Sequence, residues 1–230
     1  RARPDLVRQV ISKIKSDGIL ETYRAAMGRL ESPVPLGYSC AGEVVAVGSG
    51  IPDIQPGHRV ACFGSGQAGH AEMVSMPPTL CTSVPDNVTY EEAALAGVGA
   101  IALHSIRMSE PVLGDRVAVI GLGLLGQIAV QLLKASGCEV MGVDLQDDKI
   151  QMALSLGANE VANGSETGAA LDMVDRFTQG TGADSVMIFA STSGSEPIEL
   201  ASAMARNNGR IVAPGMVGLD LPRRFFYEKQ

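Results

Sequence analysis

A glycine-rich stretch in the middle of the chain most constrains the fold. Residues 116–126 read RVAVIGLGLLG, so a β-branched apolar run leads directly into three glycines spaced G-x-G-x-x-G. A continuous apolar run is typical of a central parallel strand that is covered on both faces. Apolar residues then recur at helical spacing until Gly137. The stretch therefore predicts a strand, a tight turn and a helix.

This pattern predicts a binding site for a dinucleotide. The first glycine permits the turn, the second lets backbone approach a pyrophosphate, and the third lets the helix pack closely on the strand. Free N–H groups and the dipole at the helix N-terminus stabilise negative charge. We expect the pyrophosphate to lie against Gly121, Gly123, Leu124, Leu125 and Gly126. A plain glycine turn without a ligand is the alternative reading of the motif alone.

A carboxylate at the end of the next apolar run distinguishes between two cofactors. That run, residues 140–143, ends in Asp144, near the expected distance of about 20 residues beyond the glycines. A carboxylate there accepts hydrogen bonds from the adenosine ribose and repels the additional phosphate of NADP, which costs several kcal/mol. Leu145 and Gln146 follow it, with no arginine. We therefore predict NAD rather than NADP. Lys149 either reaches the adenosine half or is a solvated helix charge.

Composition excludes several classes of function. A chain of 230 residues with 46% hydrophobic content can form one or two domains with a sizeable core. A net charge of −7 argues against a nucleic-acid partner. Apolar runs stay well below the ~18 residues of a transmembrane helix, so we expect no membrane partner. The chain starts with Arg1, as a fragment of a longer protein can.

The cysteines do not form a recognisable metal or disulfide pattern. Cys40, Cys62, Cys81 and Cys138 are irregularly spaced and include no C-x-x-C pair. This is neither a zinc ribbon nor a disulfide framework. We predict buried free thiols and a reducing, cytoplasmic location.

Along the rest of the chain the predicted secondary structure changes from helices to short strands and then back to helices. Residues 3–30 predict an amphipathic pair of helices with a break at Asp17–Gly18; a membrane-lying helix is the less favoured alternative. Short strands follow, expected at 43–47, 59–62 and 71–75 between glycine and proline turns. Helices return over 89–109, with a Thr89–Glu92 capping box and a break at Gly97–Gly99. From residue 114 strands alternate with helices, which predicts a doubly wound parallel α/β sheet of five strands.

Several segments resemble one known family. PLGYSCAGEV at 35–44 stands in place of a G-H-E-x-x-G-x-V segment, GHRV at 57–60 in place of G-D-R-V, and GHAEMV at 69–74 in place of G-x-x-A-E-Y-V. LGA at 156–158 and GRIV at 209–212 match later signatures. Together they resemble the medium-chain dehydrogenase/reductase family, the relatives of zinc-type alcohol dehydrogenases. The resemblance implies a Rossmann domain joined to a GroES-like barrel. We expect a helical pair over 1–32, a partial GroES-like domain over 33–108, a Rossmann domain over 109–222 and a tail over 223–230.

The zinc ligands of the family are missing from their expected positions. Tyr38 and Ser39 replace the ligand histidine and its neighbouring glutamate, and no Cys, His or Asp lies at 99–101. The cysteine-rich lobe is also absent. A catalytic zinc site needs three protein ligands, so we predict no zinc. Tyr38 either donates a hydrogen bond to a substrate carbonyl or fills the volume of the metal. His58 is expected in an exposed turn, and His70 and His104 as structural residues.

The resemblance implies hydride transfer between NAD and an alcohol or carbonyl compound. It places Ala190, Ser191, Pro214 and Gly215 along the nicotinamide and its ribose. The nearest likeness is to bacterial bi-domain oxidoreductases, in which a glucose–fructose oxidoreductase-like domain follows. It implies a sugar-like small-molecule substrate, a fused C-terminal oxidoreductase domain and a homodimer. The alternatives are an NADPH-dependent quinone or enoyl reductase and a non-catalytic dinucleotide-binding module.

Overall fold

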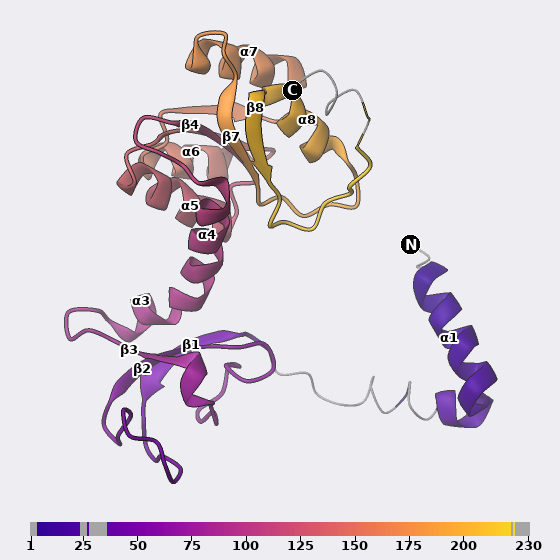
Figure 1. The fold of residues 1–230 in the computed structure, drawn as a ribbon, viewed down its shortest axis with the longest axis vertical. Coiled ribbons are helices and arrows are strands. Elements are labelled where there is room, and N and C mark those ends of the chain that lie inside the picture. Colours follow the sequence, from indigo (N-terminus) through magenta and orange to yellow (C-terminus); the bar gives the residue numbers. More distant parts are fainter. Residues whose placement is uncertain (1–3, 24–26, 28–35, 222, 224–230) are drawn as a thin grey trace. The chain divides into compact units, whose positions relative to one another are not determined.

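The computed structural model describes residues 4–23, 27, 36–221 and 223 (Figure 1). Contacts divide the chain into two compact units, residues 1–85 and 86–230, which are described separately below. Unit 1 begins with α1 (Pro4–Asp17), and Gly18 interrupts the helix with φ +85°. Residues 19–23 are again helical. The predicted helix and its break are confirmed over this range, whereas residues 24–26 and 28–30 lie outside the described residues.

The remainder of unit 1 forms a three-stranded antiparallel sheet in the order β1-β2-β3. Its elements are β1 (Ser39–Glu43), β2 (Arg59–Phe63), the short 3-10 helix η1 (Pro78–Leu80) and β3 (Cys81–Ser83). The prediction for β2 is confirmed. β3 was not predicted, because its three residues are too short a run to show alternation.

Two of the predicted strands in unit 1 are wrong. The valine-rich residues 43–47 are not a strand beyond Glu43, and β1 lies earlier in the chain over smaller residues. The partner strand explains this: β2 begins at Arg59, which pairs with Glu43, so among the described residues no strand lies opposite residues 45–47. Residues 71–75 are bends and irregular backbone, and Met73 is 73% exposed.

Unit 2 contains a five-stranded parallel sheet in the order β6-β5-β4-β7-β8. Its strands are β4 (Arg116–Ile120), β5 (Glu139–Asp144), β6 (Glu160–Asn163), β7 (Ala183–Ile188) and β8 (Ala205–Val212). Its helices are α3 (Tyr90–Ala94), α4 (Ala96–Ser109), α5 (Leu124–Ala135), α6 (Asp147–Ser155), α7 (Thr167–Thr178) and α8 (Glu196–Met204). The predicted doubly wound parallel sheet is confirmed.

Alternate residues of β4 face two separate cores. Val117 and Val119 lie in a cluster with residues of α4, α5 and α6. Ala118 and Ile120 lie in the other, with residues of α7 and α8. All four β4 side chains are at most 6% exposed. The uninterrupted apolar run in the sequence therefore reflects a strand that is covered on both faces.

The helices at the start of unit 2 were predicted in part. The capping box is confirmed, because Glu92 N donates to Thr89 Oγ1 and Thr89 N donates to Glu92 Oε2 at 2.8 Å. The Thr89 N–H and, to a lesser extent, the Thr89 hydroxyl donate to the Glu92 carboxylate and hold the pKa of Glu92 below its usual value. The break between α3 and α4 lies at Leu95 rather than at Gly97–Gly99. Both helices belong to unit 2 by contact, so the compact units do not meet at the expected 108/109 boundary.

Candidate dinucleotide site

The glycine turn lies at the carboxyl edge of the parallel sheet, where the strand order reverses. β4 has β5 on one side and β7 on the other, and such a switch point is where ligands bind in open α/β sheets. Hydrogen bonds join the loops at this edge: Gly121 N donates to Val143 O at 2.8 Å and Phe189 N to Ile120 O at 2.7 Å. The residues that follow β4 and β7 are thereby held to the ends of β5 and β4.

The structure requires glycine at two of the three positions of the motif and not at the third. Gly121 has φ +92°, and a Cβ there would overlap the backbone of Ala190. A Cβ on Gly126 would overlap the carbonyl oxygen of Gly121. In contrast, a Cβ on Gly123 would meet no atom within 4 Å, and its φ of −70° suits any residue. The fold itself requires Gly121 and Gly126, whereas the space beside Gly123 is open for a ligand.

The N-terminus of α5 offers backbone donors beside that open space. Gly123 is the N-cap residue and no side chain caps the helix. The first bond of the helix runs from Gln127 N to Gly123 O at 2.9 Å. The first N–H groups of a helix have no intrahelical acceptor and carry its positive dipole end. Leu124 is 57% exposed, while Leu125 packs against the core, so Leu125 offers its backbone rather than its side chain.

Asp144 is fixed directly beside the glycine turn. Its Oδ2 accepts a hydrogen bond from Leu122 N at 2.7 Å, and its Oδ1 accepts one from Gln146 N at 3.0 Å. A carboxylate has about four lone-pair positions, so both oxygens keep capacity for ribose hydroxyls. Leu122 is itself 1% exposed and lies against Gly142, where a Cβ would come within 3.0 Å of Leu122 Cδ1.

The buried Gln127 connects the turn to the helix that follows β5. Its Nε2 donates to Leu122 O at 3.0 Å and to Lys149 O at 2.8 Å. Both acceptors are carbonyl oxygens, which fixes the orientation of the amide, and Oε1 has no partner among the described residues. The sequence analysis missed this residue. A single glutamine on the otherwise apolar face of α5 was the available signal.

We expect Gln127→Ala to weaken NADH binding and to lower the thermal midpoint. It removes the side-chain donor from Leu122 O and from Lys149 O, and a buried group left unsatisfied costs about 1–3 kcal/mol. Gln131→Ala is the matched control, because Gln131 lies one turn later on α5, is exposed and donates only to Gln127 O at 3.2 Å. Fluorescence titration with NADH and a melting curve test both variants. Equal behaviour of the two would contradict this role.

The other predicted cofactor residues also lie at the carboxyl edge. Ala190 and Ser191 follow β7, and Pro214 and Gly215 follow β8. Gly215 N donates to Ile188 O at 2.9 Å, and a Cβ on Gly215 would overlap Ala190 O, so the two loops pack closely. Lys149 is half-buried in the first turn of α6. Their contacts with a cofactor stay predictions.

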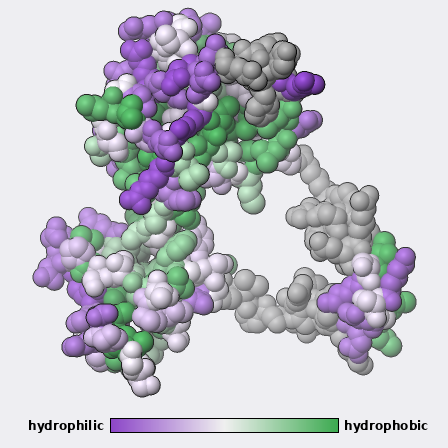
Figure 2. Space-filling view, in the orientation of Figure 1, coloured by the Kyte–Doolittle hydropathy of each residue, from purple (hydrophilic) through white to green (hydrophobic). Residues whose placement is uncertain are grey.

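Apolar side chains are exposed next to several of these residues. Figure 2 shows hydrophobic residues on the surface of unit 2. Leu124, Leu145 and Met216 are 57%, 69% and 79% exposed, and they adjoin Gly123, Asp144 and Gly215 in the chain. A dinucleotide has two flat rings with apolar faces, and such side chains suit them.

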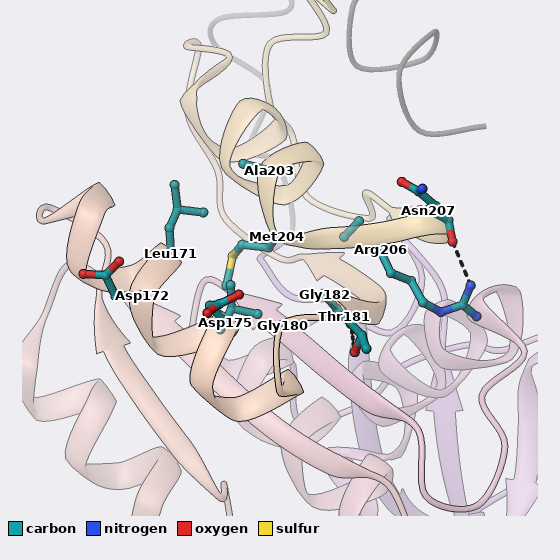
Figure 3. A pocket seen from close by; sticks show the side chains of 12 residues that line it. Leu171, Asp172, Asp175, Gly180, Thr181, Gly182, Ala203, Met204, Arg206 and Asn207 are labelled. Carbon is teal, nitrogen blue, oxygen red and sulfur yellow. Dashed lines mark hydrogen bonds between the residues drawn. The ribbon is translucent and has the colours of Figure 1, made fainter.

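A surface depression of about 710 Å³ lies elsewhere on unit 2 (Figure 3). It is bounded by α7, by residues 180–182 and by residues 203–207. These segments precede β7 or lie at the start of β8, which places the depression at the amino edge of the sheet. Arg206 at its rim pairs with Asp184 at 2.7 Å. It is therefore separate from the glycine turn.

Tyr38 and Ser39, where we expect zinc ligands of the family to be missing, offer a phenol and a serine hydroxyl. Zinc sites in proteins use imidazole, thiolate and carboxylate ligands, so this donor set suits the expectation of no zinc, which stays a prediction. The Tyr38 ring, 41% exposed, contacts Phe63 edge-on with centroids 5.9 Å apart. In the described part of the chain no group of three or more His, Cys, Asp or Glu side chains is arranged to hold a metal. Tyr38 belongs to unit 1, so its predicted role stays a prediction.

Two of the three histidines lie in unit 1 and one lies in unit 2. His58 is exposed and its Nδ1 accepts from Gln55 N at 3.2 Å. The ring of His70 lies against Gly37. His104, which was expected to pack or to cap on an apolar face of its helix, is exposed on α4. Among the described residues no helix is both long and apolar enough to cross a bilayer.

Comparisons with known proteins agree with both units. Residues 6–102 match the model of the alcohol dehydrogenase GroES-like domain, and residues 125–228 match that of the zinc-binding dehydrogenase domain. The (R,R)-butanediol dehydrogenase of Bacillus subtilis is 32% identical over 55% of this chain and 44% of its own length. Sorbitol dehydrogenase of the same organism is 27% identical over 90% of this chain and 68% of its own length.

Solved structures show the same fold. The crystal structure of 2R,3R-butanediol dehydrogenase from Bacillus subtilis superposes with a TM-score of 0.74 at 28% identity, covering 86% of this chain and 63% of that one. The chain thus spans less than two thirds of the butanediol dehydrogenase that it matches. The two domain models together cover most of its residues. The chain belongs to the medium-chain dehydrogenase/reductase family, with a Rossmann sheet and a GroES-like part.

Proposed function

We propose that this chain carries the cofactor site of an NAD-dependent oxidoreductase that acts on alcohols or carbonyl compounds without a catalytic zinc. The observation that carries the proposal is the open space beside Gly123, which lies next to the fixed carboxylate of Asp144. Donors at the start of α5 suit a pyrophosphate, and the carboxylate suits a ribose diol. The nicotinamide, when bound, accepts or donates the hydride.

The preference for NAD rests on the charge of Asp144. Both of its oxygens are held by backbone N–H groups, at 2.7 and 3.0 Å, so the carboxylate is not free to swing aside for a phosphate. A 2′-phosphate would meet this charge at close range, and like-charge contacts cost several kcal/mol.

Zinc-independent chemistry needs another means of polarising the substrate oxygen. Hydrogen-bond donors are the general alternative to a Lewis acid, and the Tyr38 phenol is the group that this chain offers for it. The alcohol and polyol dehydrogenases among the relatives support a polyol or sugar-like substrate. A non-catalytic dinucleotide-binding module is the second candidate, favoured by the absence of zinc-type donors at residues 38 and 39.

The test has two steps on the intact protein. Fluorescence titration compares NADH with NADPH, and tighter binding of NADH is expected. NAD reduction is then followed with a panel of alcohols, polyols and sugars, in buffer with and without a zinc chelator, and turnover unaffected by chelator is expected. Tighter binding of NADPH would favour the quinone or enoyl reductase alternative. NADH binding without turnover of any panel member would favour the non-catalytic module.

A further inference from the structure

Three of the four cysteines lie on one rung of the sheet in unit 1. Cys40 pairs directly with Cys62 across β1 and β2, and Cys62 pairs directly with Cys81 across β2 and β3. Residues directly opposite each other in a sheet project to the same face. The three side chains share a small core with Val60 and Ala68. The strands β1, β2 and β3 that carry them can be followed in Figure 1.

The Cys62–Cys81 pair has the spacing of a cross-strand disulfide. Val84 N donates to Arg59 O at 3.0 Å, so Arg59 and Val84 form a hydrogen-bonded pair. Alternation along the ladder makes Cys62 and Cys81 a non-hydrogen-bonded pair, in which Cα atoms lie about 4.5 Å apart. Disulfides span about 4.4–6.8 Å between Cα atoms. The two Sγ atoms are already 3.7 Å apart, so side-chain rotation accounts for most of the closure.

We propose that Cys62 and Cys81 form a reversible dithiol–disulfide site. Low-molecular-weight disulfides such as oxidised glutathione oxidise this pair. This site is separate from the dinucleotide site, and it does not depend on the proposed enzymatic activity. It connects β3, an edge strand of three residues, to the central strand of its sheet.

The exchange proceeds in two balanced steps. The Cys81 thiolate attacks one sulfur of oxidised glutathione, whose S–S bond breaks, and one glutathione thiolate leaves. Cys62 then loses its proton to solvent and attacks the Cys81 sulfur, which releases the second glutathione. The protein loses two protons and two electrons, and one disulfide is reduced to two thiols.

The exposure of the two residues and the protonation of the Cys62 thiol assign the first attack to Cys81. Cys62 is 6% exposed, whereas Cys81 is only half-buried. Burial, together with the neighbouring Cys81 sulfur, raises the pKa of the Cys62 thiol to about 12. The Cys62 thiol is therefore protonated near neutral pH and reacts only with a sulfur that is already in contact with it.

The remaining cysteines provide internal controls. Cys138 lies in unit 2, is 2% exposed and belongs to the core between β4, β5 and α5. Burial raises the pKa of its thiol, and it has no cysteine beside it, so it stays reduced. Cys40 lies on the opposite side of Cys62 from Cys81 and tests whether the oxidised pair is the one proposed.

Peptide mapping of the intact protein tests the site. The folded protein is incubated with oxidised glutathione, blocked by alkylation and cleaved after glutamates, which separates Cys40, Cys62 and Cys81 because Glu43 and Glu72 lie between them. We expect one disulfide joining the peptide 44–72 to the peptide 73–91, and its loss on reduction. Cys138 should be alkylated fully.

Three variants test which cysteines form the disulfide. Cys81→Ser should abolish the linked peptide, and Cys138→Ala should leave it unchanged. Cys40→Ser should also leave it, since Cys40 is outside the proposed pair. A linked Cys40–Cys62 pair in the wild-type protein, four alkylated thiols after incubation, or glutathione retained on Cys81 without a protein disulfide would each overturn the proposal.

Discussion

Replacing Gly123 by alanine is expected to weaken NADH binding by one to two orders of magnitude without unfolding the protein. The added methyl group meets no protein atom within 4 Å, and the backbone at φ −70° accepts it without strain. It lies instead where the proposed site places the pyrophosphate, at the start of α5. Hydrogen bonds to charged groups contribute about 1.5–3 kcal/mol, and ~1.4 kcal/mol is tenfold in affinity, so losing one contact gives about ten- to a hundredfold.

Substitutions at two other glycines distinguish a loss of NADH binding from a general effect of adding a methyl group. Gly168→Ala in α7 also places a methyl group in open space, far along the chain from the turn, and should bind NADH as the wild type does. Gly126→Ala should lower the thermal midpoint strongly, because its Cβ would overlap Gly121 O. Titration with NADH and a melting curve on each variant suffice. Unchanged NADH affinity in Gly123→Ala would show that the open space is not the pyrophosphate site.

The sequence was sufficient for unit 2 because its signals are local. The β4 strand, the turn and α5 follow one another without interruption, and the close approach of Gly126 to Gly121 O arises within that stretch. β-branched residues cover both faces of β4, and Gly121 has the positive φ that its turn requires. β7 ends at Ile188 and β8 at Val212, since the neighbouring loops rather than their own residues decide where pairing stops. Phe189 N, for example, bonds to Ile120 O as the chain leaves the sheet.

Unit 1 was less predictable because its strands depend on distant partners. Residues 44–47 have stronger β-propensity than Ser39–Glu43, but the register with β2 selects the latter. Gln127 shows the same limit within the site: its type suggests a buried polar contact, but its acceptors, Leu122 O and Lys149 O, come from segments that meet only in the folded sheet. The Cys62–Cys81 pair likewise follows from the register between β2 and β3, which the spacing of the cysteines in the sequence does not predict.

Replacing Asp144 by asparagine is expected to reverse the cofactor preference. The substitution removes the charge that opposes a 2′-phosphate, and its amide still accepts a hydrogen bond through one oxygen. NADH loses a charged acceptor for its ribose, and NADPH loses a repulsion worth several kcal/mol. At ~1.4 kcal/mol per tenfold, the ratio of the two dissociation constants should change by about a hundredfold or more.

This prediction depends on the negative charge at Asp144 itself and not on the net charge of the protein. Asp172→Asn in α7 removes the same charge from an exposed position away from the turn, and it should leave the ratio of the NADPH and NADH dissociation constants unchanged. Competitive titration of both cofactors at low and at moderate salt is the measurement, because screening weakens exposed charge contacts more than half-buried ones. If Asp144→Asn lowers both affinities by the same factor, the carboxylate only holds the Leu122 backbone in place, and another residue determines the choice between NAD and NADP.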